Sequence, residues 1–438
     1  MTDVKNSRLT WHEAASIHDA AGCIDHAGFR AEIQEKSFPS GNAQVANGRG
    51  GIAGLKDWMM LAARKGEVCM TRSGAHLCPQ MPPDDGPDAM PVLRCLTGGS
   101  VGAPIEVRRT HQSWIRSFHV NQRLWNLSPD DRYAVLGDLS HSLSLYAAVE
   151  SIHLGAQLHL VSDLNATAQL RAFRQQQITV LYATPAQIGL IDAAHRHSPP
   201  PQVRSLRLLL IGGAKLPSHH RAKMQTLFPQ AEIWKFYGSA ETSFVSMRGD
   251  DSGDDSVGQA YPGVDISIVD ADASGCGRIA VTSPYTSLGY GPGTSGSADW
   301  CNGAVITNDI GVMRAGGDLA LMGRGDRRIK IADRQVCVEE IETCILRLSS
   351  VSQVAVVPVA DTLRATCLVA FIQAADGNPR VEQVRDYCRE KLDPLARPRR
   401  IIALNHWPLL PSGKTDYGRL RARLDADSDG ANPISMAD

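Results

Sequence analysis

The sequence lacks the features that mark several large classes of protein. No apolar run in its 438 residues approaches the ~18 residues of a membrane-spanning helix. Its 45 lysines and arginines nearly balance its 46 aspartates and glutamates, so the overall charge favours neither nucleic acid nor an acidic membrane surface. The first 15 residues are polar and of mixed charge, unlike a secretory signal. We expect a cytoplasmic protein that binds neither nucleic acid nor a membrane.

Cysteine pairs with a recognisable spacing are also absent. The 10 cysteines are scattered along the chain, and none is spaced as C-x-x-C or paired with a matching histidine spacing. A zinc site or a disulfide framework would require such spacings. We therefore expect reduced, mostly buried thiols.

The composition and the first half of the chain are typical of a soluble α/β protein. Apolar residues make up 43% of the chain and charged residues 21%, and the length suffices for two or three domains. Between residues 108 and 191 helical and strand-like segments alternate, which predicts α/β layering with a largely parallel sheet. The expected helices cover residues 112–124, 145–154 and 166–175, and the expected strands cover 132–136, 157–161 and 179–183.

Beyond residue 248 the pattern changes. Segments at 257–269, 278–282 and 304–307 alternate like antiparallel strands separated by turns. A glycine-bounded, highly charged joint at 323–330 leads to a smaller unit that again combines helices and strands. Its expected helices cover 339–348 and 381–392, and its expected strands cover 353–359, 367–372 and 400–404.

The predicted fold class is therefore α/β. A large N-terminal domain of layered, largely parallel sheets with helices would carry a small antiparallel β subdomain, and a small mobile α+β C-terminal domain would follow it. We place a reduced, irregular N-terminal segment at 1–90, the core domain at 91–324, the C-terminal domain at 325–424 and a disordered polar tail at 425–438.

Two glycine-containing motifs suit a nucleotide. From Tyr237 to Glu241, a ring that can stack on a base, a glycine that admits a ligand and a carboxylate that can hold magnesium follow a strand-like piece. The loop from Thr97 to Pro104 reads TGGSVGAP, and its backbone amides can point at phosphate oxygens. It is neither a Walker A loop nor a G-x-G-x-x-G dinucleotide fingerprint. Taken singly, each motif can also be an ordinary structural turn.

Two further residues are candidates because of their surroundings. Lys414 follows Pro411-Ser412-Gly413, and a lysine displayed on such a loop can meet a phosphate once another domain swings over it. His141 lies between two expected elements, where a side chain can line a pocket. A structural role for His141 is the alternative.

Taken together and in this order, these pieces resemble the adenylate-forming (AMP-binding) superfamily of acyl- and aryl-CoA synthetases, adenylation domains and luciferases. The resemblance runs from about residue 93 to residue 420, roughly three quarters of the chain. It rests on seven blocks in the family's order: the Thr97–Pro104 loop, the region around His141, Gly212-Gly213-Ala214, Tyr237–Glu241, Asn308-Asp309, Gly323-Arg324-Gly325-Asp326 and Ser412-Gly413-Lys414.

The resemblance implies ATP-dependent activation of a small-molecule carboxylic acid. The acid would form an acyl-adenylate with release of pyrophosphate, and the acyl group would then pass to a thiol. ATP and Mg²⁺ would be required, and the acceptor would be coenzyme A or the phosphopantetheine of an acyl carrier protein.

The resemblance also implies which residues bind the nucleotide and the acid. The glycine-rich loop would wrap the β- and γ-phosphates, while strand-end glycines and an aromatic ring would border the adenine and the acyl pocket. The nucleotide-binding residues would be Thr97, Gly98, Gly99, Ser100, Gly102, Gly212, Gly213, Ala214, Tyr237, Gly238, Asp309 and Arg324, and the acyl pocket would include His141 and Gly212.

By the same resemblance three charged residues would be catalytic. Glu241 would hold magnesium, Arg324 would lie beside the ribose-binding Asp309, and Lys414 would bridge the carboxylate and the α-phosphate. Asp326 would be the hinge about which the C-terminal domain rotates. That rotation would remove the lysine and open a path for the thiol.

The sequence departs from the family pattern at several positions. Val101 replaces a hydroxyl of the phosphate loop, Ile105 its lysine, and Ala240 a threonine that would touch the α-phosphate. At roughly 1 kcal/mol or more per lost charged hydrogen bond, these changes predict weaker ATP binding rather than an inert site. Asn308 stands where the family usually has glycine, which is a mild change. Asp333 also stands where a glycine is common, and its carboxylate could obstruct a pantetheine arm.

The length before the phosphate loop is the largest departure. Family members usually carry about twice as much chain there, so we expect part of the acyl pocket to be rebuilt or supplied by another subunit of a homodimer. Three functions then fit: an acyl- or aryl-CoA synthetase, a ligase that loads a carrier protein or an amine, and a degenerate nucleotide-binding relative without turnover. Retention of Glu241, Asp309, Arg324 and Lys414 favours an enzyme, and we expect the first of the three.

Overall fold

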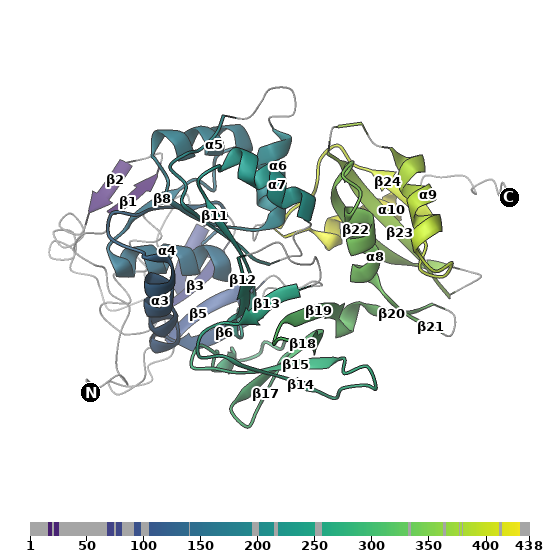
Figure 1. Ribbon diagram of the computed structural model, residues 1–438, viewed down its shortest axis with the longest axis horizontal. Helices are drawn as coiled ribbons and strands as arrows, with labels where there is room; N and C mark the ends of the chain where they lie inside the picture. The colour runs from purple at the N-terminus through teal and green to yellow at the C-terminus, as the bar shows by residue number, and fades with distance from the viewer. Residues whose placement is uncertain are drawn as a thin grey trace.

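The computed structural model shows a large domain with a smaller C-terminal domain beside it (Figure 1). No helix among the described residues is long and apolar enough to cross a membrane. The structure describes residues 16–19, 22–25, 68–73, 76–80, 92–97, 105–139, 141–194, 201–213, 218–249, 256–331, 334–361, 365–375, 377–378, 380–410 and 414–429.

A mixed sheet of 14 strands is the centre of the large domain. One half is parallel, as the alternation of helices and strands predicts, and β9 and β10 are buried along their whole length because helices cover both faces. These parallel strands are β7 (Arg132–Val135), β8 (Gln157–Leu160), β9 (Val180–Ala183), β10 (Leu208–Ile211) and β11 (Glu232–Ser239). The helices between them are α4 (Ser142–Leu154), α5 (Ala166–Gln175), α6 (Pro185–Ala193) and α7 (Ser218–Leu227).

The antiparallel half continues the same sheet, since β12 pairs with β11. Its strands are β12 (Ser243–Arg248), β13 (Ser256–Ala260), β14 (Asp265–Val269), β15 (Gly277–Thr282), β17 (Asp299–Cys301), β18 (Ala304–Met313) and β19 (Leu319–Arg324). Two strands, β11 and β18, continue beyond the residues where we expected them to end. Tyr237 lies inside β11 and Asp309 inside β18, because pairing with neighbouring strands carries each strand past a bulge.

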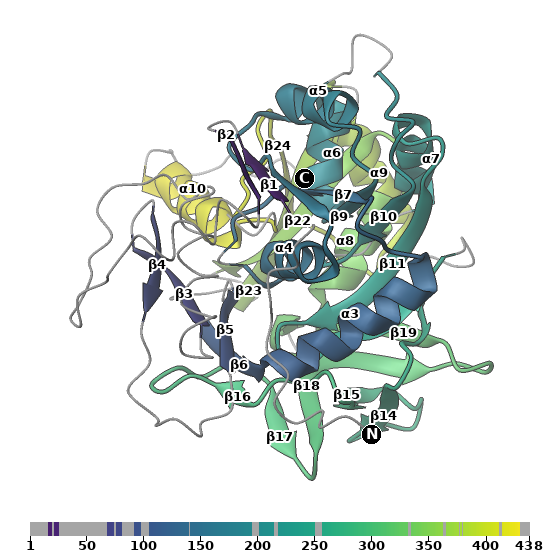
Figure 2. The same ribbon diagram turned by 90° about the vertical axis from the view of Figure 1, so that its left-hand side faces the viewer.

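A second sheet of five strands lies across α3 (His111–Trp125) and α4 from the large sheet (Figure 2). One apolar core packs both helices between the two sheets, and a second core packs α5, α6 and α7 on the opposite face of the large sheet. The second sheet contains β3 (Val68–Ser73), β4 (His76–Gln80), β5 (Val92–Thr97), β6 (Ile105–Thr110) and β16 (Gly289–Tyr290).

The described residues among the first 90 form four strands, where we expected an irregular segment. In addition to β3 and β4, β1 (Ser16–Asp19) and β2 (Gly22–Asp25) extend the edge of the large sheet. β1 pairs with β8 and β3 pairs with β5. These partners are distant in sequence, so local periodicity carries no sign of the pairing.

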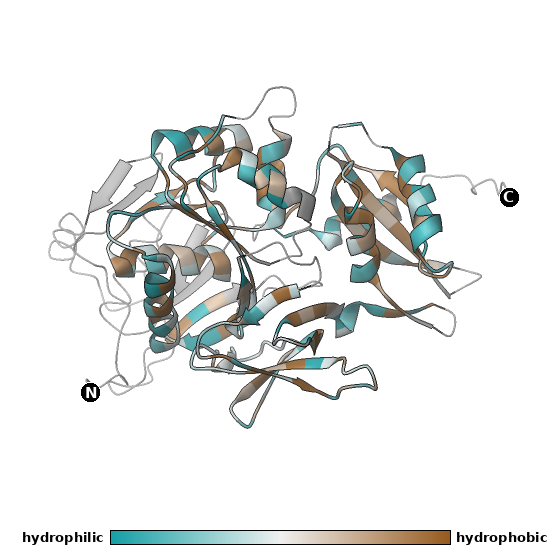
Figure 3. Cartoon of the chain, in the orientation of Figure 1, coloured by the Kyte–Doolittle hydropathy of each residue, from teal (hydrophilic) through white to brown (hydrophobic). Residues whose placement is uncertain are grey.

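The C-terminal domain is a three-stranded sheet between two apolar cores, and its strands are its most hydrophobic part (Figure 3). Helix α10 runs past residue 425, where we expected disorder to begin, and its Leu424 is buried. The elements are η2 (Gly325–Arg327), β20 (Arg328–Ile331), β21 (Arg334–Cys337), α8 (Val338–Leu346), β22 (Val351–Asp361), β23 (Ala365–Ala374), α9 (Val381–Lys391), β24 (Arg400–Ala403) and α10 (Tyr417–Asp429).

A buried polar network joins α3 and α4 to the parallel strands. The carboxylate of Glu150, which is fully buried, accepts hydrogen bonds from Tyr182 Oη (2.6 Å), Asn121 Nδ2 (2.7 Å) and Tyr133 Oη (3.3 Å). Tyr261 extends the network by donating to Asn121 Oδ1 at 2.6 Å. Burial raises the pKa of Glu150 to about 7, although the hydrogen bonds to its carboxylate act in the opposite direction.

The raised pKa of Glu150 predicts a pH-dependent stability. The folded chain keeps a proton on this carboxyl where the unfolded chain has lost it, so the stabilisation is full below about pH 4.5 and is lost as pH rises through about 7. This group should lower the free energy of unfolding by up to about 3 kcal/mol across that window. Urea unfolding of the wild type and Glu150→Gln, followed by tryptophan fluorescence at pH 5 and pH 8, measures the difference. Equal pH dependence in the two proteins would contradict the assignment.

Candidate active site

The predicted lysine lies at the carboxyl ends of the parallel strands. Gly213 follows β10 with φ +83°, and a Cβ at this residue would lie 3.5 Å from Lys414 Cε and 3.5 Å from Thr184 Cγ2. Ligands of open α/β sheets bind at this edge. The C-terminal domain therefore places its lysine directly over the predicted nucleotide site.

Three charged groups of the large domain act on the charge of Lys414. Burial lowers the pKa of its ammonium group, and repulsion from Arg324 acts in the same direction. Asp309 and Glu241 favour the charged form. The residue as a whole is exposed to solvent.

Tyr237 and Asp309 form a direct contact. The Tyr237 hydroxyl donates to Asp309 Oδ2 at 2.7 Å, and Arg324 Nη1 lies 4.0 Å from Asp309 Oδ1. Burial raises the pKa of Asp309, while the bond from Tyr237 and the charges of Arg324 and Lys414 lower it. A partly buried carboxylate with this support can accept hydrogen bonds from a ligand's hydroxyl groups.

Glu241 occupies the tip of the β11–β12 hairpin. Tyr290 Oη donates to Glu241 Oε1 at 3.1 Å, and the Ser287 amide donates to the Glu241 carbonyl at 2.7 Å. The hairpin requires glycine at position 238, where a Cβ would lie 1.9 Å from the Ser243 carbonyl oxygen. The tip is thus held in one conformation.

The surroundings of Glu241 fit Mg²⁺ bound together with phosphates. No group of three or more His, Cys, Asp or Glu side chains that could hold a metal occurs among the described residues. Mg²⁺ is usually held by one or two carboxylates together with substrate phosphates, so the single half-buried carboxylate of Glu241 suits it. The metal assignment remains a prediction.

The structure describes some of the remaining predicted residues and leaves others outside the described ranges. Thr97 ends β5 opposite Ile105 of β6, so the predicted phosphate loop connects two adjacent antiparallel strands. His141 is the N-cap of α4 and is partly buried, and its role stays a prediction. Outside the described residues lie Gly98, Gly99, Ser100, Gly102, Ala214, Asp333, Ser412 and Gly413.

The other predicted glycine, Gly212, has no room for a side chain. A Cβ there would lie 2.2 Å from the ring of Phe236, a partly buried side chain of β11. Phe236 in turn packs on Phe244, with the ring centroids 4.6 Å apart. Sequence reasoning did not identify Phe236 as a neighbour of Gly212, because the contact joins two strands.

The predicted hinge is braced on both sides. Arg324 binds Asp326 through two bonds of 2.9 Å, from Nε to Oδ1 and from Nη2 to Oδ2. Arg327 instead pairs with Glu342 of α8 at 2.8 Å and lies over the ring of Tyr417 in α10 at 4.5 Å. Arg324 ends a strand of the large sheet, so the chain changes from one domain to the other within η2.

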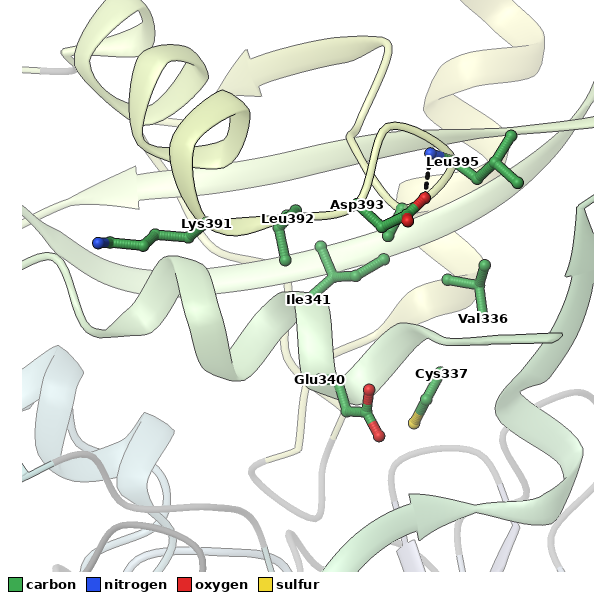
Figure 4. Close-up of a pocket in the computed structure, with 9 residues that line it drawn as sticks. Val336, Cys337, Glu340, Ile341, Lys391, Leu392, Asp393 and Leu395 are labelled. Atoms are coloured by element: carbon green, nitrogen blue, oxygen red, sulfur yellow. Dashed lines mark hydrogen bonds between the residues drawn. The ribbon is translucent and has the colours of Figure 1, made fainter. Parts of the chain in front are cut away.

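A separate hollow of about 390 Å³ lies in the C-terminal domain (Figure 4). It contains none of the predicted site residues, and we assign no ligand to it. Apolar side chains of α8 and of the segment after α9 line it, with a few polar groups at its rim. The lining residues are Val336, Cys337, Glu340, Ile341, Lys391, Leu392, Asp393, Leu395 and Ala396.

Sequence reasoning missed three residues that surround the site. Tyr290 contacts Glu241, Thr184 contacts Gly213, and Arg109 binds the carbonyl oxygen of Ala240 beside Glu241. Only Arg109 had a signal in the sequence. Side chains alternate between the two faces of a strand, so Arg109 shares the inward face of β6 with the apolar Val107. For Tyr290 and Thr184 the sequence offered none, because each reaches the site from a different part of the chain.

These features are those of a two-domain adenylating ligase. A model of the AMP-binding enzyme family matches residues 13–291, and a model of the AMP-binding enzyme C-terminal domain matches residues 340–414. The chain therefore belongs to the AMP-binding enzyme family.

Its relatives are ligases with different acceptors. An uncharacterized acyl-CoA ligase of Bacillus subtilis, YhfT, is 28% identical over 76% of this chain and 69% of its own length. A salicylyl-CoA synthase / salicylate adenylyltransferase of Streptomyces sp is 26% identical over 94% of this chain and 76% of its own. The structure of the amide bond synthetase McbA from Marinactinospora thermotolerans has a TM-score of 0.70 at 20% identity, covering 96% of this chain and 97% of that one. The chain is thus an adenylate-forming ligase that uses ATP.

Tyr237→Phe should weaken AMP binding about fivefold, because one hydrogen bond to the carboxylate of Asp309 is lost. That bond lowers the pKa of Asp309, so its loss should also move the acidic limit of AMP binding to higher pH. Calorimetric titration with AMP between pH 4 and pH 8 measures both effects. Tyr133→Phe, which removes a hydroxyl bound to the core carboxylate of Glu150, is the matched control. Unchanged affinity and pH limit in Tyr237→Phe would contradict a nucleotide role for this pair.

Proposed function

We propose that this protein joins a small-molecule carboxylic acid to coenzyme A by way of an acyl-adenylate. The observation that carries the proposal is the convergence of four charged residues that interact electrostatically. Asp309 and Arg324 come from β18 and β19, Glu241 from the tip of the β11–β12 hairpin, and Lys414 from the C-terminal domain. Such a cluster suits a reaction between two anions.

The first half-reaction would form an acyl-adenylate. A carboxylate oxygen attacks the α-phosphorus of ATP and forms a new bond to it. The bond between the α-phosphorus and the oxygen that bridges to the β-phosphate breaks, and pyrophosphate leaves with its electrons. Lys414, close to Gly213, would hold the carboxylate and the α-phosphate together and stabilise the added negative charge. Glu241 would hold Mg²⁺, which would neutralise part of the charge on the phosphates.

The nucleoside would lie between β11 and β18. Asp309 would accept hydrogen bonds from the ribose hydroxyls, with its carboxylate held by Tyr237 and Arg324. The ring of Tyr237 would border the adenine beside Gly238. Because Tyr237 packs among apolar residues of the sheet, this border is rigid before the ligand binds.

The second half-reaction would transfer the acyl group to a thiol. Lys414 must then leave the site, and a rotation at Asp326 would remove it, since Asp326 lies in η2 between the last strand of the large sheet and Arg327, which is paired with Glu342 of α8. Coenzyme A is the acceptor named for YhfT and for the salicylyl-CoA relative.

An amine is the second candidate acceptor. The match to the amide bond synthetase covers nearly the whole of both chains, whereas YhfT extends beyond the matched region. At 20% identity this likeness concerns the fold alone, so it ranks below the thiol. In either case the adenylation step is the same.

Lys414→Ala should lower acid-dependent pyrophosphate release from Mg-ATP by about a hundredfold or more, because a charged donor is lost from the transition state. The assay uses a panel of aliphatic, aromatic and dicarboxylic acids. Lys391→Ala, a change at an exposed lysine of the same domain, is the matched control and should keep the wild-type rate. Pyrophosphate release that is independent of Lys414, or none across the panel with ATP still bound, would overturn the proposed enzyme.

The same assay ranks the acceptors. Coenzyme A, a holo-carrier protein and a panel of primary amines are added in turn, and the acylated product is identified by mass spectrometry. A coenzyme A thioester supports the proposal, an amide supports the second candidate, and transfer only to the carrier protein overturns both assignments.

Asp326→Pro should uncouple the two half-reactions. Proline restricts φ at the residue that would rotate, so one domain arrangement is trapped and one half-reaction should slow at least about tenfold relative to the other. Asp326→Ala also loses the pair with Arg324 but keeps the backbone free, and it serves as the control. Single-turnover adenylation and transfer rates are compared. Normal rates for both steps in Asp326→Pro would show that the hinge lies elsewhere.

A further inference from the structure

Arg109 is a charged residue in the core of the large domain. It lies on the inward face of β6, in register with Leu93 of β5, and its exposed fraction is 0%. β6 begins where the predicted phosphate loop ends. A cation has thus been placed at an apolar position directly after that loop.

The guanidinium group binds only neutral acceptors. Nη1 donates to Ser243 Oγ at 2.6 Å, to the Tyr285 carbonyl at 3.3 Å and to Ser113 Oγ at 3.5 Å, and Nη2 donates to the Ala240 carbonyl. The group also lies over the ring of Trp114, 5.1 Å from its centroid. Within the described part of the chain, Nε has no hydrogen-bond partner and no carboxylate pairs with Arg109.

A buried cation without a paired anion is costly for a fold to retain. Burial lowers the pKa of Arg109, and the nearby groups Cys95 and Glu241 raise it, in that order of size. Arginine nevertheless keeps its proton in proteins. The structure therefore holds a permanent positive charge that interacts electrostatically with Glu241, the predicted magnesium ligand.

The acceptors of Arg109 surround Glu241. Ala240 precedes it, and Ser243 ends the hairpin tip with φ +59°, a conformation that is strained for a residue with a side chain. Tyr285 belongs to the segment whose Ser287 amide binds the Glu241 carbonyl. One guanidinium group thus fixes both flanks of the hairpin tip and the segment packed against it.

We propose that Arg109 is a positioning residue that holds Glu241 for the metal and supplies a buried positive charge to the polyphosphate of ATP. The inference rests on the proposed function, because the anion it requires is the bound nucleotide. It also accounts for a departure seen in the sequence, since Ile105 stands where the resemblance leads us to expect the lysine of the phosphate loop. Arg109 would supply the positive charge that this lysine would otherwise provide.

Arg109→Met tests the proposal through binding rather than turnover. MgATP requires the hairpin tip and the polyphosphate charge, whereas AMP lacks the β- and γ-phosphates. We expect MgATP affinity to fall about tenfold to a hundredfold, the Mg²⁺ concentration for half-maximal ATP binding to rise, and AMP affinity to stay within about twofold. Arg109→Lys retains the charge but not the fork of donors, so it should recover part of the MgATP affinity while its Mg²⁺ requirement stays raised.

Arg132→Met, a change at the amino end of β7 and away from the site, is the matched control and should bind both nucleotides normally. If wild type binds no MgATP, the proposed function itself fails. If Arg109→Met binds MgATP and Mg²⁺ like wild type, only the role of Arg109 fails. Equal losses of AMP and MgATP affinity in a folded variant would likewise reduce Arg109 to a general core residue.

Should Arg109→Met fail to fold, Ser243→Ala decides the positioning role. This change removes one acceptor of the guanidinium group at the hairpin and leaves the buried charge in place. A raised Mg²⁺ requirement with unchanged AMP affinity supports the proposal. An unchanged Mg²⁺ requirement overturns it.

Discussion

The contact between Lys414 and Gly213 depends on both domains at once. A lysine near Asp309, Glu241 and Arg324 exists only while the C-terminal domain covers the ends of the parallel strands. Gly213 adopts a positive φ, which residues with a side chain rarely do, while a Cβ there would still be at an ordinary contact distance from Lys414. The arrangement that we propose for adenylation would therefore depend on the packing of the two domains.

Two of the buried ionisable groups in the large domain, Glu150 and Arg109, are stabilised in different ways. Glu150 is saturated by hydrogen bonds and can also accept a proton, so its charge can vanish within the core. Arg109 is hydrogen-bonded as well, but its acceptors are neutral and arginine does not lose its proton, so its charge stays in the core. We propose that the phosphates of the bound nucleotide supply the negative charge that would balance Arg109.

The segment between the domains is short and has an ion-paired arginine at each end. Arg324 belongs to the last strand of the large sheet and binds Asp326, while Arg327 is paired with Glu342 in the first helix of the small domain. Only Gly325 and Asp326 lie between the two arginines. We propose that this short stretch is the hinge, which would let the small domain turn as one body and carry Lys414 out of the site after the first step.

The sequence by itself determined the α/β class, the smaller second domain and the order of the motifs that define the family. Helical and strand periodicity are local, and the spacing of Tyr237, Asp309 and Lys414 follows the family's order, so both can be read without coordinates. Only the tertiary structure decided how strands from the first 90 residues pair, and that the strand containing Asp309 continues past it. It alone also showed that Arg109 binds the carbonyl oxygen of Ala240, the residue before Glu241. These features depend on contacts between residues far apart in the chain, whose energies appear in no local pattern.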